Sequence, residues 1–486
     1  MPLSLPSVLR VRLFTCSFSS SSIFSPTTSI PLASLFSGQF RRYNYPKAHH
    51  RAISSDSESQ SITYNYIEDV EDVSKYRTGG FHPTYIGDTL KDRRYRIVHK
   101  LGYGGYSTTW LALDTLRQQY VAIKICSANS SEDSVEQKIL QKLSNTAQES
   151  LTAHPGKHLA QSLVDAFDLR GPNGHHKCLV MPPAMMSIRD AKEASYSRLF
   201  RPEIARFIIA QLALVVDFIH GKGIVHGDIH MGNVFFPLPP DVNNLTPDEI
   251  YQRYRKPELE GVVRMDGKPI GDGVPSHLVV PIWMGKSSED IQMSEAEVLL
   301  SDFGESFIPA SVERFYSNSP LSFRPPEAHF SSKPLDFAAD IWSLACLAWE
   351  ILGARPLFES WMAADDEVVA DMVDLLGKLP PEWWTQWDAR SKFYTEDGES
   401  DIRLAPGRLP GTERWGWSER LEFCIQRPRR KAGFDMISED EWTSLLAMLQ
   451  SMMHFEPDQR TTTKELLQSH WMRHWAVCKT DSKVGS

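Results

Sequence analysis

The chain has 486 residues, of which 41% are hydrophobic and 23% are charged, a composition typical of globular proteins with room for two or three domains. Its formal net charge of −9 disfavours direct binding to nucleic acid and favours basic partners. No run of about 18 consecutive apolar residues predicts a membrane span, and the scattered cysteines form no CxxC pair that would indicate zinc.

The first 55 residues differ in composition from the rest of the chain. They carry six Lys or Arg and no acidic residue, and they are rich in serine. This composition is typical of a mitochondrial transit peptide, although a disordered leader has the same features. We therefore expect a leader over residues 1–55, which favours a mitochondrial location, and an N-terminal extension over residues 56–94.

The next stretch predicts a strand-rich region. The segments "RYRIVHKLGYGGYSTTWLALD" from Arg94 and "QYVAIKICSA" from Gln119 alternate apolar and polar residues around a glycine cluster. Strands joined by a glycine-rich turn explain this pattern. The following segment, "SVEQKILQKLS", has the apolar spacing of a helix.

The second half of the chain predicts mainly helices. "RPEIARFIIAQLALVVDFIHGKG" from Arg201 indicates a long amphipathic helix closed by glycines. "DFAADIWSLACLAWEILG" from Asp336 is apolar nearly all round, as in a buried helix. Residues 237–298 lie between them, are rich in proline and show little periodicity. We interpret this segment as an insertion.

The residues around the glycine cluster suit a phosphorylated ligand. A turn without side chains lets backbone N–H groups approach phosphate oxygens, as Gly102, Gly104 and Gly105 would allow. Lys124 follows an apolar triplet in a strand and can bind phosphates, while Glu136 on the next helix can hold it as an ion pair. Each feature alone is more often structural, so the prediction depends on their order.

A second group of polar residues suits phosphoryl transfer. Asp228 follows the long helix in "IVHGDIHMGNVFF", where a carboxylate can orient a hydroxyl and accept its proton. Asn233 can bind a metal through its amide oxygen. Asp302 in "VLLSDFGES" ends an apolar strand at a glycine turn, where it can hold Mg²⁺ between phosphates. We therefore predict ATP and Mg²⁺ as cofactors, with Asn233 and Asp302 as metal ligands.

In this order the motifs resemble those of eukaryotic protein kinases. "PPE" at 325–327 stands where that family has Ala-Pro-Glu, and Arg460 stands where its arginine pairs with this glutamate. Asp340 matches the helix aspartate that braces the catalytic loop. The resemblance implies an α+β, bilobal protein kinase fold. Its implied boundaries are a kinase domain over 95–471, a β-rich N-lobe over 95–181, a larger helical C-lobe over 182–471, a spacer insertion over 237–298 and a tail over 472–486.

The resemblance also assigns a nucleotide site. "CLVMPPA" stands where kinases have the hinge, with Met181 as gatekeeper, and the Pro182 carbonyl and Ala184 can bond to adenine. The catalytic residues that it implies are Lys124, Glu136, Asp228 and His230. The nucleotide-binding residues that it implies are Leu101, Gly102, Tyr103, Gly104, Gly105, Tyr106, Ser107, Thr109, Ala122, Lys124, Met181, Pro182, Ala184 and Phe235.

Within the family, the chain most resembles the SR-protein kinases in their filamentous-fungal form. Three segments carry this resemblance: "YRTGGFHPTYIGDTL", the glycine loop with Ser107 in place of a third glycine, and "DLLGKLPPEWW". It implies an ATP-dependent serine/threonine kinase of Arg/Ser-rich proteins, a role in mRNA processing and a cytoplasmic or nuclear location. Asp365, Asp366 and Glu367 stand where the group has part of its docking groove, although acidic runs are usually solvated loops. We expect a monomer that binds protein substrates and no nucleic acid directly.

The catalytic loop departs from the family pattern at two positions. Gly227 replaces an arginine that meets a phosphate on the activation segment, so we expect residues 305–324 to be held by packing instead. SR-protein kinases lack this arginine as well. His230 replaces a lysine that contacts the γ-phosphate, so a return to lysine is expected to raise turnover. Pro320 stands near the threonine that usually braces this lysine, so we expect no bracing hydroxyl.

Two alternatives remain open from the residues. "HGDIHMGN" also resembles the catalytic loop of aminoglycoside and choline kinases, which phosphorylate small alcohols on the same fold. A weakly active enzyme or an inactive kinase-shaped scaffold would also fit the histidine in this loop. The PPE motif, Asp340 and Arg460 argue against the first alternative. The presence of the lysine, both aspartates and the asparagine argues against the second.

Overall fold

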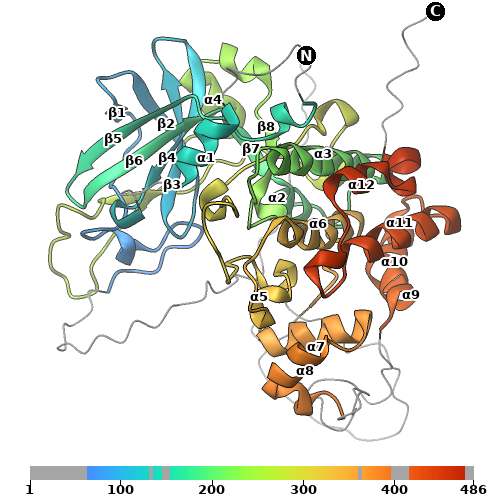
Figure 1. The fold of residues 1–486 in the computed structure, drawn as a ribbon. Coiled ribbons are helices and arrows are strands. Elements are labelled where there is room, and N and C mark those ends of the chain that lie inside the picture. The colour runs from blue at the N-terminus through green and yellow to red at the C-terminus, as the bar shows by residue number, and fades with distance from the viewer. Residues whose placement is uncertain (1–62, 131–134, 145–153, 360–363, 396–414, 477–486) are drawn as a thin grey trace, which may run out of the picture. The chain divides into compact units, whose positions relative to one another are not determined.

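The structure is a computed structural model that describes residues 63–130, 135–144, 154–359, 364–395 and 415–476 (Figure 1). The predicted leader over residues 1–55 lies outside these ranges. Of the predicted tail over 472–486, Met472–Ala476 form a helical turn that packs on the large lobe, and the rest lies outside the described residues. Strands gather in the N-terminal part of the described chain and helices in the C-terminal part (Figure 1). The predicted α+β fold class, with a small β-rich lobe and a larger helical lobe, is therefore confirmed.

The small lobe is built on an antiparallel sheet with the strand order β1-β2-β3-β4-β6-β5. The glycine cluster forms the turn between the second and third strands, as predicted. Tyr95, Trp110 and Ile123 are buried in the apolar cluster of this sheet. The strands are β1 (Thr89–Leu90), β2 (Tyr95–Tyr103), β3 (Ser107–Asp114), β4 (Gln119–Cys126), β5 (Asp165–Gly171) and β6 (Gly174–Met181).

The segment predicted to be helical from its apolar spacing forms helix α1 (Val135–Ser144). It buries Ile139, Leu140 and Leu143, which lie on one face of the helix. The helix lies against the turn Phe303–Glu305 of the large lobe. This contact brings two regions of the active site together that are far apart in the sequence.

The large lobe is organised around α3 (Pro202–Gly221) and α6 (Phe337–Leu352), which pack against each other. Proline begins α3, where its missing N–H costs little. By length and composition α3 could cross a membrane, but 61% of its apolar window is buried, as in the core helix of a globular domain. The other helices are α2 (Ile188–Glu193), α4 (Pro247–Tyr254), α5 (Glu327–Phe330), α7 (Asp365–Leu376), α8 (Pro381–Gln386), α9 (Trp417–Arg420), α10 (Arg427–Ala432), α11 (Glu439–Met452) and α12 (Thr463–Gln468).

A small antiparallel sheet places the catalytic loops. It has the order β11-β8-β7, with β7 (Ala184–Ser187), β8 (Val234–Pro237) and β11 (Leu299–Leu300). Asn233 directly precedes β8, and Asp302 follows β11 by two residues. Because β8 and β11 are paired, the loops at their ends lie side by side.

The insertion over residues 237–298 contains regular structure. Thr246 and Glu249 form a reciprocal capping box at the start of α4, and β9 (Leu259–Gly261) pairs with β10 (His277–Val279). Val242 and Ile250 pack with Tyr120 of the small-lobe sheet. The low periodicity of this segment therefore reflects short elements rather than an unstructured linker.

The N-terminal extension packs on the insertion and the small lobe. Val73, Tyr76 and Phe81 share an apolar cluster with the insertion hairpin. Glu71 and Lys100 form an ion pair in which neither side chain is more than 1% exposed, and Tyr76 adds a hydrogen bond to the carboxylate. Such a pair is tolerated in an interior only when both charges are well satisfied. The extension is thus part of the folded lobe.

Candidate active site

The charged residues predicted for the nucleotide side converge. Lys124 lies on β4, Glu136 on α1, and Asp302 follows β11. The Lys124 ammonium donates to both carboxylate oxygens of Glu136 and to Oδ1 of Asp302, each at 2.8 Å. The predicted ion pair between Lys124 and Glu136 is therefore confirmed as a contact, and Asp302 joins it.

This triad carries a net negative charge, because two carboxylates face one ammonium. Burial on its own lowers the pKa of Lys124, but the charges of Asp302 and Glu136 outweigh it and raise that pKa. Lys124 in turn lowers the pKa of Asp302 to about 2. Burial raises the pKa of Glu136 despite its bonded lysine. The triad is thus suited to accept further positive charge.

Asp302 and Asn233 fit the role of metal ligands. The Asp302 side chain is 49% exposed, and its φ of +62° is uncommon for a residue other than glycine. Asn233 uses its Nδ2 to donate to Asp228, at 2.8 Å to the carbonyl and 3.0 Å to Oδ2, which leaves its amide oxygen for another ligand. Carboxylate and amide oxygens suit Mg²⁺. Within the described ranges, no group of three or more His, Cys, Asp or Glu could hold a metal.

The glycine-rich turn lies beside the triad. Gly102 on β2 is paired with Thr109 on β3, and Thr109 is paired with Lys124 on β4. A Cβ at Gly102 would meet no atom within 4 Å, so the space beside this backbone is open. Lys75 of the N-terminal extension donates to the Gly105 carbonyl at 3.2 Å. Nothing in the sequence pointed to this anchor, since Lys75 lies outside every motif.

The predicted hinge joins β6 to β7. Met181 ends β6 and pairs with Ala122, and both are buried. Gln161 donates to the Pro182 carbonyl at 3.1 Å, so this predicted adenine acceptor already holds one donor and retains one lone pair. The remaining predicted lining residues are half-buried Leu101, Thr109, Ala184 and Phe235, buried Ser107, and the exposed tyrosines Tyr103 and Tyr106.

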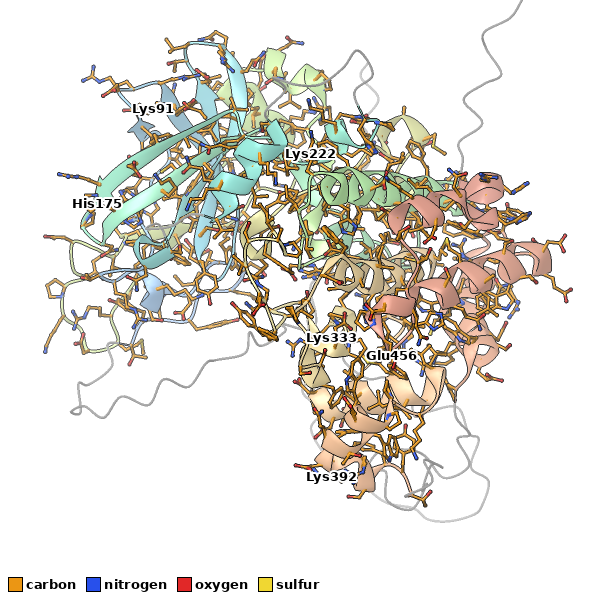
Figure 2. All side chains as sticks on the ribbon, viewed as in Figure 1. Lys91, His175, Lys222, Lys333, Lys392 and Glu456 are labelled. Atoms are coloured by element: carbon orange, nitrogen blue, oxygen red, sulfur yellow. The ribbon has the colours of Figure 1, made fainter. Side chains whose placement is uncertain are left out.

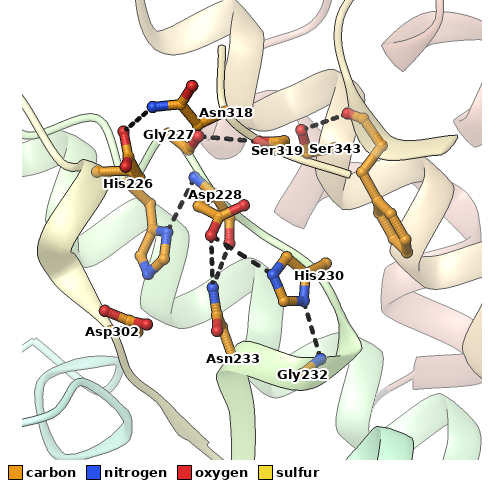
Figure 3. A network of polar contacts seen from close by, with 12 residues as sticks. His226, Gly227, Asp228, His230, Gly232, Asn233, Asp302, Asn318, Ser319 and Ser343 are labelled. Atoms are coloured by element: carbon orange, nitrogen blue, oxygen red, sulfur yellow. Dashed lines mark hydrogen bonds and ion pairs between the residues drawn. The ribbon is translucent and has the colours of Figure 1, made fainter. Parts of the chain in front are cut away.

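Asp228 lies in the loop between α3 and β8, where a substrate hydroxyl can approach. Its Oδ2 accepts from Asn233 Nδ2 at 3.0 Å and lies 3.4 Å from Nε2 of His230 (Figure 3). Its Oδ1 is buried without a hydrogen-bond partner in the described structure. Burial raises the pKa of Asp228, but the hydrogen bond with His230 outweighs it, so that the pKa lies below its usual range. An ionised, unpartnered oxygen is suited to accept a proton.

Asp340 on α6 braces this loop, as the sequence predicts. Its Oδ2 accepts from the His226 N–H at 2.7 Å, and its Oδ1 accepts from the Gly227 N–H at 2.9 Å. Nearby, Arg460 donates to both oxygens of Glu327 at 2.8 and 2.6 Å, with both side chains at most 3% exposed. The predicted pairing of the PPE glutamate is therefore confirmed.

Gly227 has a backbone conformation that favours glycine. Its φ is +77°, and a Cβ at this position would lie 2.6 Å from the carbonyl oxygen of Glu305. A side chain would therefore strain the loop and displace the activation segment. The departure from the family's arginine has a local cause, because the activation segment packs directly on the loop backbone.

The activation segment is held by contacts of its own. Val225 and Phe307 exchange backbone hydrogen bonds at 2.9 and 3.0 Å. Arg314 donates to the Glu305 carbonyl at 2.5 Å, and Asn318 donates to the Glu305 carboxylate at 2.9 Å. These contacts support the expectation that packing, rather than a phosphate, holds this segment.

A hydroxyl does brace the catalytic loop, and it belongs to Ser319. Its Oγ donates to the Gly227 carbonyl at 2.9 Å, and the residue is 1% exposed (Figure 3). This bond reaches the loop backbone, and Ser319 is not among the hydrogen-bond partners of His230 or Asp228 in the described structure. The expectation that residue 230 lacks its usual bracing hydroxyl therefore stays a prediction.

His230 is tied down on both sides of its ring. Its Nδ1 accepts from the Gly232 N–H at 3.0 Å and lies 3.1 Å from Nη2 of Arg189, while its Nε2 faces Asp228. The ring therefore contacts the catalytic aspartate rather than standing free for a phosphate. Arg189 on α2 belongs to no motif, and sequence reasoning missed it.

Comparison with known proteins places this geometry in a family. The model of the protein kinase domain matches residues 95–242 and 288–472, and the break lies inside the predicted insertion. A serine/threonine protein kinase of Aspergillus fumigatus is 24% identical over 416 residues, which cover 83% of this chain and 90% of the relative. The serine/threonine-protein kinase SRPK of Physarum polycephalum is 27% identical over 432 residues, which cover 83% and 91%.

Shorter and more distant matches agree. Protein kinase dsk1 of Schizosaccharomyces pombe is 32% identical over 195 residues, which cover 39% of this chain and 35% of the relative. A solved kinase domain superposes with a TM-score of 0.54 at 15% identity, covering 80% of this chain and 98% of that one. At this identity the superposition supports the fold alone.

A two-lobed fold with a Lys–Glu–Asp triad opposite an Asp–Asn loop is the arrangement of a protein kinase. The chain belongs to the protein kinase family, and among its curated relatives it is similar to SR-protein kinases, as the sequence predicted. It is an ATP-dependent serine/threonine protein kinase, and the small-alcohol kinase and scaffold alternatives are not favoured. A kinase domain implies ATP and typically Mg²⁺, which supplies positive charge to the phosphates when bound.

Proposed function

We propose that the enzyme phosphorylates serines in Arg/Ser-rich proteins and in this way regulates mRNA processing. The similarity to SR-protein kinases supports this substrate class, and one human relative, SRSF protein kinase 3, is 33% identical over 170 residues. The observation that carries the proposal is an acidic pocket on the large lobe. Arginine-rich substrates need carboxylates and aromatic surfaces, and this pocket offers both.

The pocket has a volume of about 460 Å³ and lies between α5, α7 and the segment after α8. Lys392, one of the lining residues, is labelled in Figure 2 beside α7 and α8. The lining contains both aspartates and aromatic rings, so that a guanidinium could pair with one and stack on the other. Its lining residues are His329, Phe330, Asp365, Asp366, Val369, Gln386, Trp387, Asp388, Ala389 and Lys392.

The aspartates of the pocket have different neighbours. Asp366 accepts from Trp387 Nε1 at 2.9 Å and so fixes the aromatic wall. Asp365 is 53% exposed and lies 3.4 Å from Arg324 of the activation segment. A substrate arginine at Asp365 would therefore lie beside the segment that borders the catalytic loop. Glu367, the third residue of the predicted acidic run, does not line the pocket.

Peptide kinetics test this proposal. An Arg-Ser repeat peptide should have a kcat/KM at least about tenfold above that of a matched Lys-Ser peptide, because only arginine can bind a carboxylate with two parallel bonds and also stack. Asp365→Asn should raise KM for the Arg-Ser peptide, whereas Asp248→Asn on the exposed face of α4 should not. Equal use of both peptides, with no effect of Asp365→Asn, would reject the Arg/Ser class and leave the kinase activity intact.

We propose a cytoplasmic or nuclear location, because Arg/Ser-rich substrates of mRNA processing are found there. The acid-free segment over residues 1–55 favours mitochondria instead. Fusing this segment to a fluorescent protein separates the two. Mitochondrial fluorescence would contradict the proposed location and remove the enzyme from its proposed substrates.

A further inference from the structure

We propose that Arg189 is a positioning residue for phosphoryl transfer, which acts on Asp228 through His230. The proposal concerns the kinase reaction itself and holds for any acceptor, so it does not rest on the Arg/Ser substrate class. It assigns a role to a side chain on α2 that lies about forty positions before the catalytic loop in the sequence.

The donors around His230 determine which nitrogen carries the proton. Nδ1 faces the Gly232 N–H at 3.0 Å and the Arg189 Nη2 at 3.1 Å. A backbone N–H and a guanidinium can only donate, so Nδ1 must accept. The ring proton therefore lies on Nε2, which points at Asp228 Oδ2 from 3.4 Å. Arg189 and Gly232 together select this tautomer.

The backbone of the loop leaves room for this arginine. A Cβ at Gly232 would lie 2.9 Å from Arg189 Cζ and 2.9 Å from His230 Cε1. Only a residue without a side chain lets the guanidinium approach the ring so closely. On the side of the activation segment, the ring of Phe323 lies 6.0 Å from that of His230. The imidazole is thus held between an arginine and an aromatic ring.

The charge of Arg189 also acts on a second polar group, Glu350 on α6. Glu350 on α6 has a buried carboxylate oxygen, Oε2, without a hydrogen-bond partner in the described structure. Burial raises the pKa of Glu350, and the charges of Lys192 and Arg189 oppose the rise. The guanidinium therefore lies within the electrostatic reach of this carboxylate as well as in contact with His230.

The consequence is a defined role for each oxygen of Asp228. Oδ2 accepts from Asn233 and lies 3.4 Å from Nε2 of His230, while Oδ1 has no hydrogen-bond partner in the part of the chain that the structure describes. Without Arg189 the histidine could turn or take the other tautomer, and Asp228 would lose one of the two donors that fix it. Small errors in the position of a catalytic group are costly, with roughly a hundredfold loss in rate for a 1 Å displacement.

A double-mutant cycle tests whether Arg189 acts through His230. We expect Arg189→Ala to lower the kcat of peptide phosphorylation and ATP hydrolysis by roughly tenfold or more, with the affinity for ATP unchanged. In a His230→Ala background, Arg189→Ala should have almost no further effect, because the residue through which it acts is gone. Fully multiplicative losses would overturn the proposal, since Arg189 would then act independently. Arg201→Ala, which removes a partly exposed arginine bonded to the Glu289 carbonyl, is the matched control and should leave kcat unchanged.

A second pair of variants distinguishes positioning from a merely structural role. Arg189→Gln keeps an N–H donor, whereas Arg189→Met keeps only the length of the side chain. We expect Gln to retain clearly more kcat than Met, and added guanidinium ion to restore part of the activity of Arg189→Ala. Equal losses in Gln and Met, or no rescue of a folded Arg189→Ala protein, would overturn the proposal. If Arg189→Ala does not fold, the comparison of Gln with Met decides.

Discussion

The nucleotide side and the acceptor side of this active site are held together by different forces. On the nucleotide side, Lys124, Glu136 and Asp302 are joined by charge, with three contacts of 2.8 Å. On the acceptor side, Asp228 is held by an amide and a histidine, and its loop is fixed through backbone groups of Gly227. Charged contacts depend on the identity of the side chain, whereas backbone contacts depend on the conformation. The acceptor side can therefore depart from the family pattern while the nucleotide side cannot.

The largest expected effect is the loss of the charge triad. Lys124→Met or Asp302→Ala should lower ATP turnover by about a thousandfold or more, because preorganised charge at the phosphates is lost in each case. Thermal unfolding should show that both proteins still fold. The matched control is Lys177→Met, which removes a lysine paired with Asp168 on the same sheet and should leave turnover unchanged. Near-normal turnover in either triad variant would show that charge is not what holds the nucleotide side together.

The next effect should come from the backbone of the catalytic loop. Gly227→Ala places a Cβ 2.6 Å from the Glu305 carbonyl at a φ of +77°, so the free energy of unfolding should fall by about 2 kcal/mol or more. Gly227→Arg, which restores the family's usual residue, should be at least as harmful. Chemical denaturation measures both.

A glycine in open surroundings provides the control for that experiment. A Cβ at Gly221, at the end of α3, would meet nothing within 4 Å, so Gly221→Ala should leave the unfolding free energy unchanged or raise it slightly. If Gly227→Arg were as stable and active as the wild type, the backbone conformation at Gly227 would not be what holds the acceptor side together.

A smaller effect is expected at His230, and its direction differs from the expectation drawn from the sequence. A lysine there would bring an ammonium beside the Arg189 guanidinium, and the Gly232 N–H would lose its acceptor. His230→Lys should therefore lower kcat by roughly tenfold rather than raise it. His230→Asn keeps an acceptor suited to the N-cap and should lose less. A faster His230→Lys enzyme would show that charge at the γ-phosphate outweighs the positioning of Asp228.

The same contrast explains how much of the site the sequence could reveal. The pair of Lys124 and Glu136 and the metal ligand Asp302 were predicted because each stands in a recognisable motif and the motifs follow a fixed order. That Asp302 joins the pair was seen only in the structure. Arg189, Lys75 and Ser319 were missed because each acts through a contact between distant segments, and a single arginine, lysine or serine outside a motif looks like any surface residue.

The fold, like the site, could be predicted only in part from the sequence. The long helix α3 was predicted from its amphipathic pattern, and the buried helix α6 from a segment that is apolar nearly all round. The eight-residue α4 was not, although Thr246-Pro247 with Glu249 is the sequence pattern of a capped helix start. Its apolar residues pack with residues of the small-lobe sheet. The sequence alone could not show this contact, so the helix was not predicted.

The smallest expected effect is that of phosphorylation on the activation segment. Arg314 and Asn318 already hold Glu305, and Ser319 is 1% exposed, so a kinase could not reach its hydroxyl without opening the segment. Protein made in bacteria should therefore be as active, within about twofold, as protein treated with upstream kinases. Arg314→Ala should lower activity in both preparations, because it removes a contact that holds the segment. A large rise in activity on phosphorylation of Ser317 would show instead that the segment is not held by packing, and that the acceptor side depends on added charge as the nucleotide side does.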